Sequence, residues 1–236
     1  VQRVMGKNVS VNLGKADGIL SENEQVKGEE FEPTERIKVY ILEVKDTPKG
    51  PRILLSRTHP GLVKRLFESE VAEVKDGTVE IKSIAREAGS RTKIAVWSND
   101  PDVDPVGACV GMNGARVNSI VEELRGEKID IINWDENPAI LIENALSPAK
   151  VIAVMADPDE KTALVVVPDY QLSLAIGKEG QNARLAARLT GFKIDIKSET
   201  QARESGELYD YDDEDEYYDE EEYSEEGAVE SQETET

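Results

Sequence analysis

Apolar and polar residues alternate near the start of the chain, as they do in a strand with one buried face. Between residues 8 and 13, Val9, Val11 and Leu13 lie on the same face. Similar patterns predict further short strands at 18–20, 36–41 and 53–55. Because Gly and Pro turns separate these runs, the pattern predicts a small all-β barrel over residues 1–60.

The predicted strand 36–41 carries the first candidate contacts to a ligand. Arg36, Lys38 and Tyr40 share one face of this strand, so two cations and one aromatic ring are predicted to point outward together. Barrels bind single-stranded nucleic acid with this combination. An ordinary solvent-exposed strand face has the same pattern, so both interpretations stay open.

Beyond residue 60 the period of the apolar positions becomes helical. His59, the only histidine, is flanked by Thr58 and Pro60, which favour a helix start, and it is therefore interpreted as a helix-start residue rather than a catalytic base. The β-rich runs 78–86 and 92–97 follow and predict a hairpin.

An internal repeat with a spacing of 66 residues gives the strongest evidence for architecture. The tetrapeptide Gly111-Met112-Asn113-Gly114 falls on Gly177-Lys178-Glu179-Gly180. After one deletion, residues 126–131 also match residues 191–196. Each copy is thus predicted to consist of a helix, a G-x-x-G loop, a second helix, a turn and a strand, which makes both copies α+β.

The two G-x-x-G loops suit the binding of a phosphate chain. Glycine lets the backbone approach a ligand closely, and the helix after the loop offers unpaired N–H groups at its positive end. The repeat therefore predicts a sugar-phosphate clamp at Gly111–Gly114 and another at Gly177–Gly180. A tight turn of the helix-turn-helix kind is the alternative, but it does not explain the flanking strands.

A helix, a G-x-x-G loop and a helix between strands resemble the KH domain, whose loop clamps about four backbone nucleotides. A barrel followed by two such units resembles the NusA family of bacterial transcription elongation, termination and antitermination factors. The segments 107–114 and 175–182 carry this resemblance, which covers residues 1–200. It implies a multidomain chain with an OB barrel of ribosomal-protein type at 1–60 and prokaryotic-type KH domains at 61–136 and 137–200.

The resemblance implies a function in transcription without enzymatic activity. We expect the chain to bind nascent single-stranded RNA and to modulate pausing, termination and antitermination by RNA polymerase. Implied partners are single-stranded RNA, RNA polymerase and other transcription factors, and we expect a cytoplasmic monomer with no cofactor, metal or membrane. Family members usually begin with a polymerase-binding domain, and this chain is expected to begin after it, inside the first barrel strand.

The implied RNA contacts are the two loops and the helix starts that follow them. They comprise, beside Arg36, Lys38 and Tyr40, the residues Gly111, Met112, Asn113, Gly114, Arg116, Gly177, Lys178, Glu179, Gly180, Asn182, Arg184 and Arg188. The family commonly has a basic residue where this chain has Asn113, which removes one charge from the first loop.

The two predicted clamps differ in the charge of the helix after the loop. Arg184 and Arg188 are four residues apart on one helix face, whereas the first copy has Asn118 and Glu122 at these positions. The second module is therefore predicted to bind phosphates more strongly. Pairing of these arginines with nearby acids is the alternative.

Composition adds an acidic tail to this picture. The net charge is −21, of which −16 lies in residues 201–236, so residues 1–200 carry only −5. Residues 201–236 cannot bury a core and are predicted to be disordered. Two roles stay open for this tail: it keeps the chain soluble, or its acids and five tyrosines imitate RNA.

Counts of residue types exclude several other classes of protein. Cys109 is the only cysteine, which excludes an intrachain disulfide and a thiolate metal cluster, and its helical spacing from Val106 predicts a core position. No apolar run approaches the ~18 residues of a membrane-spanning helix. A phosphate-handling enzyme would need a Gly-Lys-Ser/Thr pattern after its glycines. The alternative function is that of accessory domains of an RNA-processing or RNA-degrading enzyme, where we expect KH before the barrel.

Overall fold

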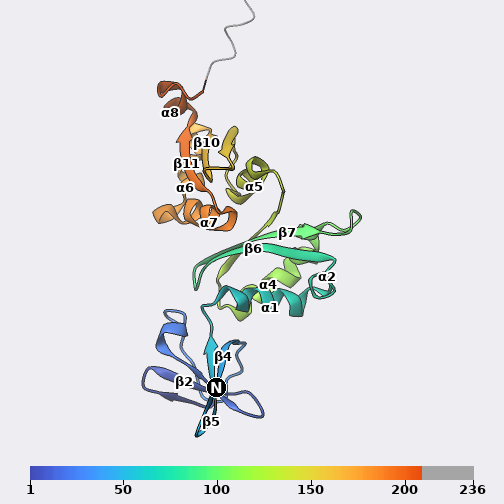
Figure 1. The fold of residues 1–236 in the computed structure, drawn as a ribbon, viewed down its shortest axis with the longest axis vertical. Helices are drawn as coiled ribbons and strands as arrows, with labels where there is room; N and C mark the ends of the chain where they lie inside the picture. The colour runs from blue at the N-terminus through green and yellow to red at the C-terminus, as the bar shows by residue number, and fades with distance from the viewer. Residues whose placement is uncertain (209–236) are drawn as a thin grey trace, which may run out of the picture.

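The computed structural model describes residues 1–208, so most of the predicted tail lies outside the described residues. Three modules, each with its own sheet, follow one another along an elongated molecule (Figure 1). The predicted ranges 1–60, 61–136 and 137–200 each contain one sheet, while their boundaries stay predictions. Among residues 1–208, no helix combines the length and the apolar composition needed to cross a membrane.

The N-terminal module is a five-stranded sheet in the order β1-β2-β3-β5-β4. Its strands are β1 (Arg3–Met5), β2 (Asn8–Asn12), β3 (Asp17–Leu20), β4 (Tyr40–Thr47) and β5 (Gly50–Ser56). β3 and β5 are parallel, and the other neighbours are antiparallel. Val9, Val11, Leu20 and Leu55 form its small core. Within the described residues β1 and β4 are not paired, so the sheet does not close into the predicted barrel.

The predicted strand 36–41 is displaced along the chain. β4 begins only at Tyr40, and a β-bulge follows Ile41. Ile37 and Val39 pack against the core as their alternation predicts, but Ile41 is 51% exposed. The bulge adds one residue to the strand and thereby interrupts the alternation of buried and exposed side chains.

The second module packs four helices on one face of the sheet β6-β7-β8. Its elements are α1 (Pro60–Glu70), α2 (Ala72–Lys75), β6 (Val79–Glu87), β7 (Arg91–Ser98), α3 (Pro105–Val110), α4 (Ala115–Glu123) and β8 (Lys128–Asn133). The predicted hairpin is β6 and β7, and β8 is parallel to β7. A core that includes Phe67, Ile94 and Ile120 joins the helices to the sheet.

The only histidine and the only cysteine of the chain lie where the sequence predicts them. His59 is the N-cap of α1, where its Nδ1 accepts a hydrogen bond from the Gly61 N–H at 2.9 Å. Cys109 is fully buried in the core of the second module. Burial raises the pKa of its thiol to about 11, so the group is a poor nucleophile at neutral pH.

The third module repeats this architecture around the sheet β11-β10-β9. Its elements are α5 (Pro138–Ala145), β9 (Ala153–Asp157), β10 (Thr162–Val167), α6 (Leu172–Ile176), α7 (Gln181–Thr190), β11 (Lys193–Ser198) and α8 (Glu199–Glu204). Helix α8 corrects the prediction that disorder begins at residue 201. Ser198 and Gln201 form a capping box at its start, and Ala202 is buried, so the chain is helical to Glu204.

The second and third modules share a hydrophobic core. Ala85, Ala95 and Ile132 from the sheet of the second module pack with α5 and α7 of the third. In Figure 1, α7 lies against β6 on the sheet face opposite α1 and α4. The sheet β6-β7-β8 is therefore covered on both faces.

Candidate nucleic-acid interface

The two G-x-x-G loops have almost the same backbone conformation. Gly111 has φ 74° and ψ 172°, and Gly177 has φ 78° and ψ 170°. Asn113 and Glu179 both lie in the left-handed region, at φ 54° and 55°. The repeat inferred from the sequence is thus also a repeat of backbone geometry.

Each loop leads into a helix whose first N–H groups have no side-chain cap. Gly114 is the N-cap of α4 and Gly180 is the N-cap of α7, and neither position supplies a capping side chain. At the tips of the loops, Met112 is 85% exposed and Lys178 is exposed. The N–H of Ala115 donates to the Met112 carbonyl, and that of Gln181 donates to the Lys178 carbonyl. The other N–H groups of the first turn are therefore the ones that can bind a phosphate at the positive helix end.

Two predicted contacts, Arg116 and Asn182, lie behind their loops at equivalent positions of the repeat. The guanidinium of Arg116 donates to the Ala108 carbonyl at 2.7 Å and pairs with Glu73 at 3.0 Å. The buried amide of Asn182 donates to the Ala175 carbonyl at 2.9 Å. Both side chains tie the loop to the helix before it, and their role as direct RNA contacts stays a prediction.

Arg184 and Arg188 face the second module. Arg184 donates through Nε and Nη2 to the carboxylate of Glu87 at the end of β6, and Arg188 lies 3.8 Å from the same carboxylate. Gln181 also donates to Glu87, at 3.0 Å. Hydrogen bonding from Arg184 holds the pKa of Glu87 below its ordinary value. Without RNA, the two arginines therefore pair with a nearby acid, as the alternative interpretation predicts. Both side chains nevertheless remain about half exposed.

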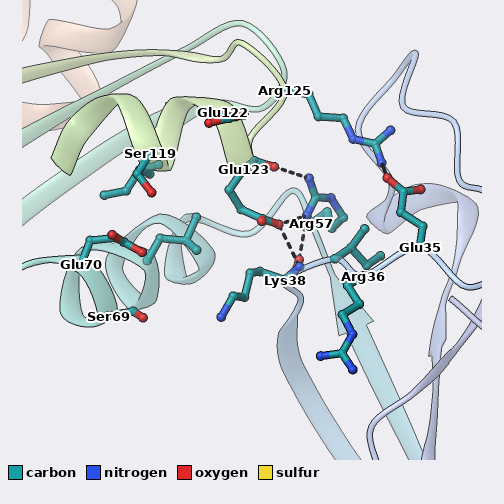
Figure 2. Close-up of a pocket in the computed structure, with 13 residues that line it drawn as sticks. Glu35, Arg36, Lys38, Arg57, Ser69, Glu70, Ser119, Glu122, Glu123 and Arg125 are labelled. Atoms are coloured by element: carbon teal, nitrogen blue, oxygen red, sulfur yellow. Dashed lines mark hydrogen bonds and ion pairs between the residues drawn. The ribbon is translucent and has the colours of Figure 1, made fainter. Parts of the chain in front are cut away.

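The predicted trio on the N-terminal module is divided between two places. Arg36 and Lys38 line a cleft of about 360 Å³ between this module and helices α1 and α4 (Figure 2). Tyr40 instead stacks on His59, with parallel rings and 4.6 Å between their centroids. The ring of Tyr40 is therefore part of the junction with α1 and does not lie beside the two cations.

Arg57 holds this junction together. Its guanidinium is fully buried and forms a two-pronged ion pair with Glu29, with both N···O distances at 2.7 Å. It also donates to the Lys38 carbonyl at 2.7 Å and to the Glu123 carbonyl at 3.0 Å, as Figure 2 shows in part. The N-terminal module is thereby tied to the end of α4.

A second cleft, of about 340 Å³, lies between the second loop and the second module, and sequence reasoning missed two of its residues. Arg91 and Lys128, at the starts of β7 and β8, line it together with Lys178. Arg91 pairs with Asp130 at 2.7 Å. No sequence signal brings these cations to a loop some 50 to 90 residues further along the chain, because the packing of the two modules does so.

Comparison with known families agrees with this geometry. The model of the NusA-like first KH domain matches residues 57–134, and that of the NusA-like second KH domain matches residues 138–204. The chain belongs to the NusA family. The two KH domains of this family correspond to the second and third modules described above.

Curated relatives in the NusA family carry the name "Transcription termination/antitermination protein NusA". The protein of Bacillus subtilis is 63% identical, over 87% of this chain and 56% of the relative. That of Halalkalibacterium halodurans is 60% identical, over 89% and 55%. That of Thermus thermophilus is 49% identical, over 79% and 48%. The chain thus spans about half the length of the curated relatives it matches.

Proposed function

We propose that this chain is the RNA-binding part of a transcription factor that binds nascent single-stranded RNA and modulates pausing, termination and antitermination. The observation that carries the proposal is the pair of G-x-x-G loops with matching backbone angles, each followed by an uncapped helix start. The names of the relatives support the transcriptional role. RNA polymerase and other transcription factors are the proposed protein partners, in the cytoplasm, and the chain acts without catalysis.

The N-terminal module is proposed to be an OB-type domain that also contacts RNA. Its five short strands and the placement of β5 between β3 and β4 support this, because the OB fold is a partly open five-stranded Greek-key barrel. Arg36 and Lys38 are exposed at its cleft with the second module. These two cations extend the proposed interface beyond the two loops.

The expected mode of binding follows from the charges. Because residues 1–200 carry −5, affinity has to come from the loops and from contacts to bases rather than from general attraction to a polyanion. A handful of phosphate contacts gives a slope of log K against log salt of roughly −2 to −4. A steeper slope would contradict a binding site confined to the loops and their surroundings.

A titration of fluorescent single-stranded RNA tests the proposal. The full chain is compared with a variant that carries Met112→Asp, Asn113→Asp, Lys178→Asp and Glu179→Asp, with circular dichroism as the check on folding. We expect the folded variant to lose binding at least tenfold. Equal binding by both chains would mean that the loops are not the site.

The two halves of this variant form a matched pair. Met112→Asp with Asn113→Asp lowers the charge of the first loop by two, and Lys178→Asp with Glu179→Asp lowers that of the second loop by two. A difference between the halves therefore reports on the loops themselves and not on net charge. We expect the larger loss from the second loop, beside which Arg91 and Lys128 lie.

A further inference from the structure

A third cleft, of about 430 Å³, lies at the ends of β7 and β8, where Asn144 of α5 in the third module also lines it. Trp97 at the end of β7 and Trp134 after β8 form its aromatic side, with ring centroids 5.6 Å apart and rings at 87°. Pro101 and Pro105 add apolar surface. Trp97 is 41% exposed, a large apolar area for a side chain that the core does not use.

The two loops that frame this cleft are acidic. Residues 98–104 contain three aspartates and residues 133–137 contain one aspartate and one glutamate, while neither loop contains a base. Asp100 and Asp135 are the two carboxylates that line the cleft itself. The cleft thus combines an aromatic surface with a negative field.

One cation beside the aromatic pair is already engaged. The ammonium of Lys82 lies 5.4 Å from the centroid of the Trp134 ring, and it pairs with Glu80 at 2.5 Å. This contact demonstrates that a cation can sit against the aromatic pair. The exposed face of Trp97 is available for another.

These features select the chemistry of the ligand. An RNA base can stack on tryptophan, but its phosphates would lie beside Asp100 and Asp135 and be repelled. A cationic side chain gains from both the ring and the carboxylates. Arginine fits better than lysine, because its flat guanidinium stacks on an aromatic face while its N–H groups bind a carboxylate.

We propose that this cleft binds an arginine side chain in a flexible, proline-containing segment of a partner protein. Proline suits the flanking positions, since aromatic-lined grooves bind extended Pro-rich segments. The cleft includes Pro105 at the start of α3, whereas the first G-x-x-G loop follows the end of this helix at Val110. The two sites thus lie at opposite ends of α3, about 9 Å apart along the helix.

The experiment uses the fact that Trp97 and Trp134 are the only two tryptophans of the chain. Both line this cleft, so their fluorescence reports on its occupancy. The full chain is titrated with a blocked octapeptide of alternating Arg and Pro, with the same peptide carrying Lys for Arg, and with single-stranded RNA. We expect a saturable change of emission with the Arg peptide, binding at least fivefold weaker with the Lys peptide, and no change of emission with RNA.

Variants then test the residues, with binding followed by the anisotropy of a labelled Arg peptide. Trp97→Ala should weaken binding at least tenfold, and Asp100→Asn and Asp135→Asn about threefold each. Glu136→Gln is the matched control, because it removes one negative charge from the same loop outside the cleft. It should change binding less than twofold.

Four outcomes would overturn the proposal. Equal binding of the Arg and Lys peptides would mean general attraction between charges, as would an equal effect of Asp135→Asn and Glu136→Gln. A change of tryptophan emission with RNA that competes with the Arg peptide would make the cleft a platform for bases. Absence of binding by the Arg peptide would show that arginine is not the ligand of this cleft. This result is independent of the RNA titration that tests the two loops.

Discussion

Helices α4 and α7 begin in the same way and are joined to their neighbours differently. Both follow a G-x-x-G loop with matching backbone angles. At the end of α4, the carbonyl and the carboxylate of Glu123 accept hydrogen bonds from the buried Arg57 of the preceding module. In the first turn of α7, the half-exposed Arg184 instead pairs with the partly buried Glu87 of the preceding module.

The two contacts differ in their exposure to water. The contacts of Arg57 are shielded from water and fix the position of the N-terminal module. The contact between Arg184 and Glu87 remains open to solvent, so a phosphate can compete for the guanidinium. The repeat unit therefore has a buried ion pair at one junction and a solvent-exposed ion pair at the other.

Removal of Arg57 should have the largest effect. Arg57→Ala leaves the carboxylate of Glu29 buried without its partner, and breaking such a pair costs about 3–5 kcal/mol. Urea unfolding of the full chain measures the loss. Arg57→Lys keeps the charge without the two-pronged geometry and should give an intermediate value. A loss below about 1 kcal/mol for Arg57→Ala would contradict the structural role of this junction.

Alanine at the first glycine of each loop should have the second-largest effect on stability. Both positions combine a positive φ with an extended ψ, a conformation that costs a residue with a Cβ about 1–3 kcal/mol. A Cβ at Gly111 would meet the flexible side chain of Arg116, whereas a Cβ at Gly177 would lie 2.8 Å from the backbone nitrogen of Asn182. Gly177→Ala should therefore destabilise the chain more than Gly111→Ala, as thermal unfolding can measure. The reverse order would mean that the two loops are not held in the way described.

Glu87→Gln tests whether RNA can displace the ion pair between Arg184 and Glu87. The substitution removes the charge that occupies Arg184 and Arg188, so RNA should bind about two- to fivefold more tightly. Arg184→Ala with Arg188→Ala should weaken RNA binding more than Arg116→Ala does. Equal losses in this last comparison would remove the proposed advantage of the second module.

The smallest expected effect is a dependence of this contact on pH. The pKa of Glu87 is lowered by its hydrogen bond from Arg184, so the contact stabilises the folded chain fully above the ordinary value of 4.5. This stabilisation is lost as the pH falls through the lowered pKa of the folded state. In an NMR titration, the signals of the Glu87 carboxyl and of the Arg184 Nε–H should change over the same pH range. In Glu87→Gln, the Arg184 Nε–H signal should not change with pH over this range.

Local patterns predicted the repeat correctly because its signals lie within short segments. The glycine spacing and the amphipathic helices around residues 111 and 177 predicted two equivalent loops, and the structure has these two loops with matching backbone angles. The strand at 36–41 was misplaced because alternation does not reveal the bulge after Ile41. Helices α5 and α8 were missed, although the Asn137-Pro138 cap and the capping box at Ser198 are recognisable signals.

Features that depend on pairs of distant residues could not be predicted. The partner of Arg184 lies 97 residues earlier in the chain. Arg57 pairs with Glu29, 28 residues earlier, and with Glu123, 66 residues later. The aromatic cleft needs Trp97 and Trp134 to meet at the ends of two strands that α3 and α4 separate in sequence. Packing between elements creates such sites, and periodicity carries no information about it.

The sheet β6-β7-β8 is shared between the cores of two modules, and this has a consequence for how the chain unfolds. Ile94 belongs to the core of the second module, while its neighbour Ala95 belongs to the core shared with the third. Opening the third module would expose the apolar face around Ala85 and Ala95 to water. We therefore expect the backbone amides of β7 to be among the slowest to exchange with deuterium, and both modules to unfold in one cooperative step.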